Sequence, residues 1–437
     1  MRQSESISSS RGNEVSLRTL PAPVLDLCAR LEEQGLRSLS QGEGLLDHLR
    51  PEEDVAGSSP PAFVRTCSIL CEATPEQLAR ALPRAVVTSE DGVRWTQGTP
   101  EGPVDILCCG TRSLDETLCA FGLGPLTFGF RPADASWQDP AGQRQAFLSG
   151  ELTLVDASDK VGATLGAATN PFDVAPRRYW IAARLIAEHG LTPNGAVLDA
   201  AQTAFEGLRE RLPQAAPARR EIRRILDCED PGPALRFLRE SGVGPFLVPG
   251  TRPENEDRIR LLPMLPAVRW AAWLRGSATA SAMVRLRVPH ALARRVERLQ
   301  ATHPLDRTVD SGREGGLRRI LSRLTAEELE ALFSWRRLDL AHNPNESERL
   351  EGERKLAELE DRIAKIRTTA SNLQEVRALA IDGAAVMDLL GAGPGRHVGQ
   401  ALAHLARHVA EAPERNLREP LETELLAWAR ENTNLLD

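Results

Sequence analysis

Hydrophobic positions change their spacing along the chain, which divides it into a mixed first part and a helical second part. Between residues 20 and 150, short apolar runs alternate with helical segments. Val24, Leu25, Cys28 and Leu31 recur at helical spacing. Strands are expected at 63–70, 86–87, 93–95 and 104–109, and a helix is expected to begin after the N-cap residue Thr74. This pattern predicts a mixed α/β unit.

From residue 176 the apolar positions keep helical spacing almost to the C-terminus. One amphipathic helix is expected to end at Gly190 as its C-cap. Further helices are expected over 197–211, 217–227, 231–241, 263–275, 280–301 and 315–338. The charged segment 346–370 is expected to be a long helix with one apolar stripe, formed by Leu350, Leu356, Leu359 and Ile363. One stripe of this length favours packing on neighbouring helices over a dimeric coiled coil.

Composition supports a helix-rich protein and limits how it could bind nucleic acid. Aromatic residues make up only 4% of the 437 residues, so the cores depend on Leu, Ala and Val, and Leu and Ala favour helices. The net charge of −7 excludes a global positive field, so a nucleic-acid surface would have to be a local patch of arginine. The abundance of arginine suits phosphate binding and equally fits a coding bias.

Cysteine and histidine spacing gives no metal site. None of the seven cysteines forms a CxxC motif near a histidine, so a zinc site is not expected. We interpret the cysteines as reduced thiols of a cytoplasmic protein. His404 and His408 are four residues apart, but without a third ligand they favour a surface pair. No stretch of about 18 apolar residues occurs, so no membrane partner is expected.

The C-terminal segment carries the most specific motif. Its pattern has glycine and proline before one expected helix and polar residues at the start of the next. The matching positions are Ile381, Gly383, Gly391, Pro394, Gly395, Val398, Gly399, Asn416, Arg418, Glu419 and Leu421. In these positions the chain resembles the tail of the CCA-adding tRNA nucleotidyltransferases and bacterial poly(A) polymerases. Free N–H groups at a helix start suit a phosphate, so Gly393 and Gly395 are candidate RNA contacts. A tight loop capping the helix is the alternative.

The resemblance continues through residues 173–191 and 221–243. Arg178 and Arg184 fall on the first and third arginines of the family's neck pattern, so the resemblance implies that they bind the nucleotide. Ala175 and Ile181 replace the Asp and the second Arg that hydrogen-bond the incoming base in the family. Neither side chain has a polar atom, so neither can do so here.

The head of the chain resembles the family's catalytic domain through the helix start ATPEQ at 73–77. Counting back from it, the family's two metal-binding aspartates fall on Thr66 and Ser68, and the third carboxylate falls on Asp105. Two Mg²⁺ ions need anionic oxygen ligands, and hydroxyl groups are weak substitutes. Asp105 is therefore a residual catalytic candidate, and Thr66 and Ser68 mark the lost metal positions.

Other charged positions of the family pattern are also replaced. The triphosphate and sugar contacts become Leu118, Cys119, Ala120 and Gly124, and an optional His–Asp metal pair becomes Arg275 and Gly276. Apolar and turn positions of the family pattern persist. The replaced positions are therefore those that carry the chemistry in the family.

Arginine clusters on the expected helices are candidates for RNA binding. Their members include Arg219, Arg223, Arg285, Arg295 and Arg319, at spacings that can form one helix face. The family holds tRNA by its backbone along body and tail helices, and a basic stripe would do so here. Solvated faces paired with glutamate are the alternative.

We predict an α+β protein with a disordered lead-in at 1–15, a head at 16–160, and helical neck, body and tail at 171–250, 251–376 and 377–437. Its predicted function is that of a pseudoenzyme that binds tRNA or another structured RNA, with no cofactor and no DNA partner. The alternatives are an active nucleotidyltransferase with a rebuilt metal site, using Mg²⁺ and CTP or ATP, and a protein-interaction subunit of a larger complex.

Overall fold

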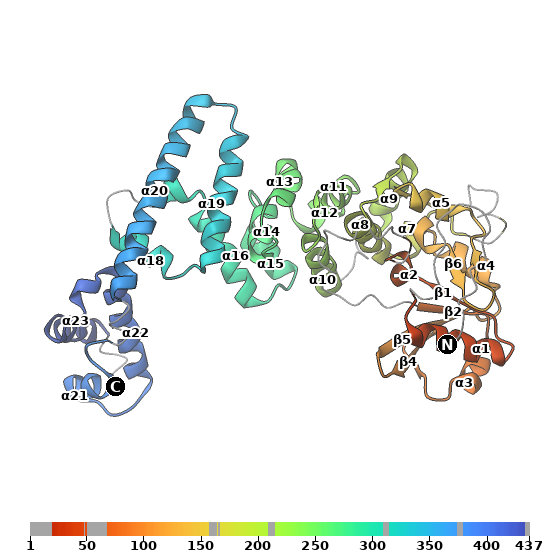
Figure 1. Ribbon diagram of the computed structural model, residues 1–437, viewed down its shortest axis with the longest axis horizontal. Helices are drawn as coiled ribbons and strands as arrows, with labels where there is room; N and C mark the ends of the chain where they lie inside the picture. The colour runs from red at the N-terminus through yellow and green to blue at the C-terminus, as the bar shows by residue number, and fades with distance from the viewer. Residues whose placement is uncertain are drawn as a thin grey trace, which may run out of the picture. The chain divides into compact units, whose positions relative to one another are not determined.

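The computed structural model describes residues 20–47, 49, 68–156, 164, 167–208, 215–308, 314–373 and 379–432 (Figure 1). They divide into two compact units. The first runs up to Asp257 and includes Val284–Arg287, and the second comprises Arg258–Met283 and the chain from Val288 onwards. The predictions for residues 1–15 and for Thr66 lie outside the described residues.

A seven-stranded mixed sheet forms the start of the first unit. Its order is β3 (Val86–Val87), β4 (Arg94–Thr99), β5 (Gly102–Cys108), β2 (Ser68–Cys71), β1 (Ser38–Gln41), β6 (Gly129–Arg131) and β7 (Ser136–Gln138). Strands β2 and β5 are parallel, and the other neighbours are antiparallel. A second small sheet pairs β8 (Glu151–Leu152) with β9 (Thr192–Pro193). With the helices below, this confirms the α+β class.

The two faces of the seven-stranded sheet are covered by different helices. Alternate strand residues such as Ile69 and Ile106 pack in one cluster with Leu27 of α1 (Ala22–Glu33) and Leu78 of α3 (Pro75–Ala81). On the other face, Leu39 and Leu70 pack with Leu114 and Leu118 of α4 (Leu114–Ala120). The capping box predicted at Thr74 is present, with Gln77 as its partner.

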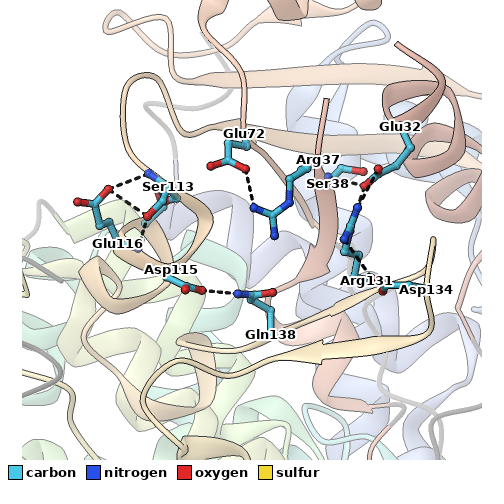
Figure 2. Close-up of polar contacts among 11 residues, drawn as sticks. Glu32, Arg37, Ser38, Glu72, Ser113, Asp115, Glu116, Arg131, Asp134 and Gln138 are labelled. Carbon is cyan, nitrogen blue, oxygen red and sulfur yellow. Dashed lines mark hydrogen bonds and ion pairs between the residues drawn. The ribbon is translucent and has the colours of Figure 1, made fainter. Parts of the chain in front are cut away.

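Polar contacts fix helices α1 and α4 to strand ends, as Figure 2 shows. Arg131 at the end of β6 pairs with Glu32 of α1 at 3.0 Å, and Arg37 ahead of β1 pairs with Glu72 after β2 at 3.2 Å. Gln138 of β7 donates from Nε2 to Asp115 Oδ1 of α4 at 2.5 Å. Arg37 and Glu72 lie at one end of β1 and β2, and Gln41 and Ser68 lie at the other end. The site described below is at the end that contains Gln41 and Ser68.

Short helices and then longer ones complete the first unit. They are α2 (Glu43–Asp47), η2 (Gly124–Leu126), α5 (Gln143–Leu148), α7 (Pro171–Val174), α8 (Arg177–His189), α9 (Gly195–Leu208), α10 (Ala215–Leu226), α11 (Gly232–Glu240) and α12 (Val243–Leu247). Helix α8 ends at Gly190, whose φ of 62° is left-handed, as the sequence predicts. Helix α13 (Pro253–Arg258) follows α12, and its last residue, Arg258, belongs to the second unit.

The regular secondary structure of the second unit is helical in its described residues. It contains η3 (Ile259–Leu261), α14 (Pro266–Trp273), most of α15 (Thr279–Arg285), α16 (His290–Thr302), α17 (Leu305–Thr308), α18 (Glu314–Leu321), α19 (Ala326–Ala341), α20 (Glu346–Leu373), α21 (Gly383–Leu390), α22 (Arg396–Glu411), η4 (Pro413–Arg415) and α23 (Arg418–Glu431). In the long helix α20, Leu356, Leu359 and Ile363 pack on α17, α18 and α19, whereas Leu350 is exposed. Among the residues described, no helix is long and apolar enough to cross a membrane.

Two helices predicted as continuous are each divided in the structure. The segment 280–301 splits into α15 and α16, because Arg287 takes a left-handed φ of 50° and Pro289 cannot donate a helical hydrogen bond. The segment 315–338 splits into α18 and α19, because Thr325 and Glu328 form a capping box that starts a new helix. Both predictions of one continuous helix were wrong.

Candidate functional site

A row of polar side chains crosses the sheet and includes Ser68 and Asp105, two of the three positions that the resemblance assigns to metal binding. Gln41 of β1 is the register partner of Ser68 of β2, and Ser68 is the register partner of Asp105 of β5. Asp105 is in turn the partner of Thr96 of β4. Register partners project to the same face of a sheet. The structure therefore brings Ser68 and Asp105 side by side.

The row contains one carboxylate. Thr96 Oγ1 donates a hydrogen bond to Asp105 Oδ1 at 2.8 Å, and Gln41 Nε2 donates to the Leu126 carbonyl at 2.9 Å. Asp105 is exposed to solvent, and Ser68 is half-buried. Within the described ranges, no group of three His, Cys, Asp or Glu residues could hold a metal ion. The donor set of this row does not fit two Mg²⁺ ions, because its other members are neutral.

A second carboxylate, that of Glu43, follows the turn after β1 but pairs with helix α8. Gly42 has a left-handed φ of 94°, and a Cβ atom there would lie 3.6 Å from Ser68 Oγ. The next residue, Glu43, starts α2, and its carboxylate accepts a hydrogen bond from Arg184 Nη2 on α8. Glu43 is therefore engaged by α8 rather than by the row.

Arg184 and Arg224 form a largely buried ion-pair cluster with three glutamates. Arg184 also lies 3.4 Å from Glu221 (Nε to Oε2), and its side chain is 8% exposed. Arg224 Nη2 lies 2.8 Å from Glu188 Oε1 and 3.8 Å from Glu43 Oε2. Burial raises the pKa of Glu43, and the two guanidinium groups oppose this rise. The charge of Arg184 is thus balanced within the chain, and its nucleotide-binding role stays a prediction.

Arg178, the other predicted nucleotide-binding residue, contacts backbone carbonyls. Its guanidinium donates to the Pro171 carbonyl and, at 2.7 Å, to the carbonyl of Ala120 at the end of α4. Burial lowers the pKa of Arg178 to about 10, and the neighbouring charge of Arg177 contributes. These bonds fix the start of α8 to α4 and α7. Both acceptors are carbonyl oxygens, and no described carboxylate forms an ion pair with Arg178.

The arginines predicted to bind RNA fall into two groups. Arg223 pairs with Asp227 at 3.4 Å, and Arg295 pairs with Glu328 at 2.8 Å. Arg219 instead donates to the carbonyl of Arg287 at 2.6 Å, and Arg285 donates to the carbonyl of Phe246 at 3.0 Å. Carbonyl groups do not neutralise a guanidinium, so only the second group keeps unbalanced charge. Arg319 lies in α18, and its side chain is outside the described part.

The tail glycines lie at an exposed helix start. Gly395 is the N-cap of α22, with no side chain capping it, and Gly393 and Gly395 are both exposed. A hydrogen bond of 3.0 Å joins His397 Nε2 to the Gly393 carbonyl. The proposed phosphate contact at these glycines stays a prediction.

At the position of the family's optional His–Asp pair, the structure has a salt-bridge cluster that the sequence did not predict. Arg275 Nη1 pairs with Asp339 of α19, which also accepts from His303 Nε2 at 2.9 Å. The His303 ring stacks on Trp335, with centroids 3.9 Å apart. Burial opposes ionisation of Asp339, but His303 and Arg275 together hold its pKa below the usual range. The cluster joins Arg275, after α14, to Asp339 of α19 and to His303, the C-cap of α16.

This cluster predicts a pH-dependent stability. Burial lowers the pKa of His303, although its bond to Asp339 opposes the shift, and the buried His303 Nδ1 has no hydrogen-bond partner among the described residues. The unfolded chain therefore binds the proton at higher pH than the folded chain, so stability is complete above about pH 6.5 and falls as pH decreases. We expect a slope of up to about 1.4 kcal/mol per pH unit as the pH falls below about 6.5, in the unfolding free energy of the second unit. His303→Phe, which keeps the stack, should flatten it in urea titrations, and equal slopes would contradict the assignment.

His404 and His408 of α22 meet a third residue that sequence spacing could not identify. Glu424 of α23 lies 2.7 Å from His404 Nε2 and 3.6 Å from His408 Nδ1. Both histidines are only partly exposed. The contact joins the two tail helices.

Comparisons with known proteins bear on the fold. No family model and no curated protein matches the chain. Among solved structures, the Bacillus stearothermophilus CCA-adding enzyme in complex with CTP is 16% identical, with a TM-score of 0.64 over 95% of this chain and 100% of that one. Another CCA-adding enzyme with CTP is 14% identical, with a TM-score of 0.62 over 95% and 96%. The Thermotoga maritima CCA-adding enzyme complexed with tRNA is 13% identical, with a TM-score of 0.56 over 94% and 97%.

The chain therefore has the fold of the CCA-adding nucleotidyltransferases over nearly its whole length. The resemblance predicted from the sequence is confirmed at the level of fold. Identities of 13 to 16% leave the chemistry to be argued from this chain's own residues.

Proposed function

We propose that this protein binds tRNA or a similar structured RNA in the cytoplasm and does not extend it. The observation that supports this most is the row across the sheet, where Asp105 is the one carboxylate and Ser68 stands beside it. A fold used for nucleotidyl transfer persists around a donor set that cannot hold the metal pair. No cofactor, membrane or DNA partner is part of this proposal.

Local charge supports an RNA partner despite the net charge of −7. Arg219 and Arg285 keep guanidinium groups that no described carboxylate neutralises. The Thermotoga protein of the same fold was solved with tRNA bound. Phosphate contacts from fixed guanidinium groups bind RNA by backbone and shape, which suits a structured RNA.

Equilibrium binding of labelled tRNA tests this proposal. We expect saturable binding at 50 mM KCl, weakened about a hundredfold at 200 mM if roughly four phosphates are contacted, since each contributes a slope of about −0.7 to −0.9. A single-stranded RNA of equal length should bind more weakly. Absence of binding at low salt would overturn the proposal and favour a protein-interaction subunit.

A further inference from the structure

An exposed arginine occupies a backbone conformation that costs free energy. Arg287 and Ala135 are the two non-glycine residues with positive φ in the part of the chain that the structure describes, and Arg287 has a φ of 50°. Left-handed backbone costs an arginine roughly 1–2 kcal/mol relative to right-handed conformations, and glycine avoids most of this cost. Strain of this kind at an exposed residue is a reason to look for function.

The turn that holds Arg287 is fixed by hydrogen bonds. The Arg287 N–H donates to the Val284 carbonyl at 3.0 Å, and the Arg287 carbonyl accepts from Arg219 Nη1 of α10 at 2.6 Å. Arg285, two residues earlier, donates from Nη1 to the carbonyls of Phe246 and Leu247 at 3.0 and 3.3 Å. Arg219 of α10, Arg285 at the end of α15 and Arg287 in the turn after it therefore all involve the segment Val284–Arg287 of the first unit.

None of these three arginines has an ion pair with a described residue. Arg285 and Arg287 are exposed, and Arg219 is half-buried. A guanidinium has five N–H donors, and one carbonyl bond leaves several free. The Arg219 guanidinium lies against the Arg287 backbone, and these positive charges have no described carboxylate as ion-pair partner, so an anionic partner would stabilise this segment.

We propose that Arg219, Arg285 and Arg287 form a phosphate-binding surface for the RNA backbone, with Arg287 held outward by its left-handed turn. This inference rests on the proposed RNA binding and places Arg287, which the sequence grouped with a helical arginine cluster, in a left-handed turn after α15. Phosphate accepts paired N–H bonds from arginine, whereas lysine offers only a point charge. An RNA backbone supplies phosphates at regular intervals, so it can satisfy neighbouring guanidinium groups together.

The variant Arg287→Gly tests the surface in the full chain. Glycine fits the positive φ, so thermal stability should be equal or slightly higher. Affinity for tRNA should fall about three- to tenfold at 50 mM KCl, and the salt slope should lose roughly one phosphate's contribution. Arg285→Gln should act in the same direction.

The matched control is Arg236→Gln, which removes an exposed arginine of the same unit that is already paired with Asp257. It should leave tRNA affinity nearly unchanged. If the wild type binds tRNA and Arg287→Gly binds equally well with the same salt slope, the surface is wrong while the proposed function stands. If the wild type binds no tRNA, the proposed function itself fails. Loss of an acidic protein partner upon Arg287→Gly, without RNA binding, would assign the surface to protein instead.

Discussion

Replacing Arg184 with methionine is expected to lower the free energy of unfolding of the first unit by about 3–5 kcal/mol. The substitution keeps a similar apolar volume but removes the main partner of Glu43 and a close contact of Glu221. Both carboxylates are largely buried, so they would be left without adequate compensation. Hydrogen exchange of residues 177–189 and 215–226 measures the loss, since α8 and α10 supply the cluster.

The control for this prediction is the double variant Arg184→Met with Glu43→Met. Removing a carboxylate together with its guanidinium partner should restore much of the protection, because replacing a buried pair by apolar groups is often nearly neutral. Unchanged stability in Arg184→Met, accompanied by loss of CTP or ATP binding, would instead support the nucleotide-binding role suggested by the resemblance. The experiment thus separates the two roles of Arg184.

Features set by local rules could be predicted from the sequence. The capping box at Thr74 and the glycine end of α8 depend on residues within a few positions of one another. The resemblance assigned Ser68 and Asp105 to metal positions of the family, and the parallel register of β2 and β5 makes them partners. Propensity alone gave no sign that these two distant residues are related.

Features set by distant partners could not be predicted. Strand β1 (Ser38–Gln41) contains two serines and a glutamine, so it lacks the apolar alternation that marks a strand. Its burial in the middle of the sheet overrides that composition. Glu43 and Arg184 are 141 residues apart, and no local spacing links them. The same holds for the contact between His303 and Asp339.

The positions that the resemblance assigns to metal binding make different contacts in the two units. At the site of the optional metal pair, Arg275 is paired with Asp339 and packed near Trp335. In the head, Thr96 donates to Asp105 and no described cation pairs with it. Both positions are therefore held by contacts within the chain, while Arg219 and Arg285 have no ion pair with a described residue.

Loss of nucleotide addition is the largest effect that this account predicts. Two-metal phosphoryl chemistry depends on several carboxylate ligands, and removing even one electrostatic contributor commonly costs a factor of about 100 to 1,000 in rate. Here Ser68 is neutral, and Asp105 is exposed and bound to a hydroxyl group. We expect no detectable incorporation at enzyme concentrations where an active CCA-adding enzyme completes the reaction.

The most direct measurement incubates the protein with labelled tRNA lacking its 3′ end, CTP, ATP and Mg²⁺, and analyses one reaction on native and denaturing gels. The predicted result is a shifted complex on the native gel and tRNA of unchanged length on the denaturing gel. Extension of the tRNA by the wild type, abolished in Asp105→Ala, would contradict the account and show an active enzyme with a rebuilt metal site.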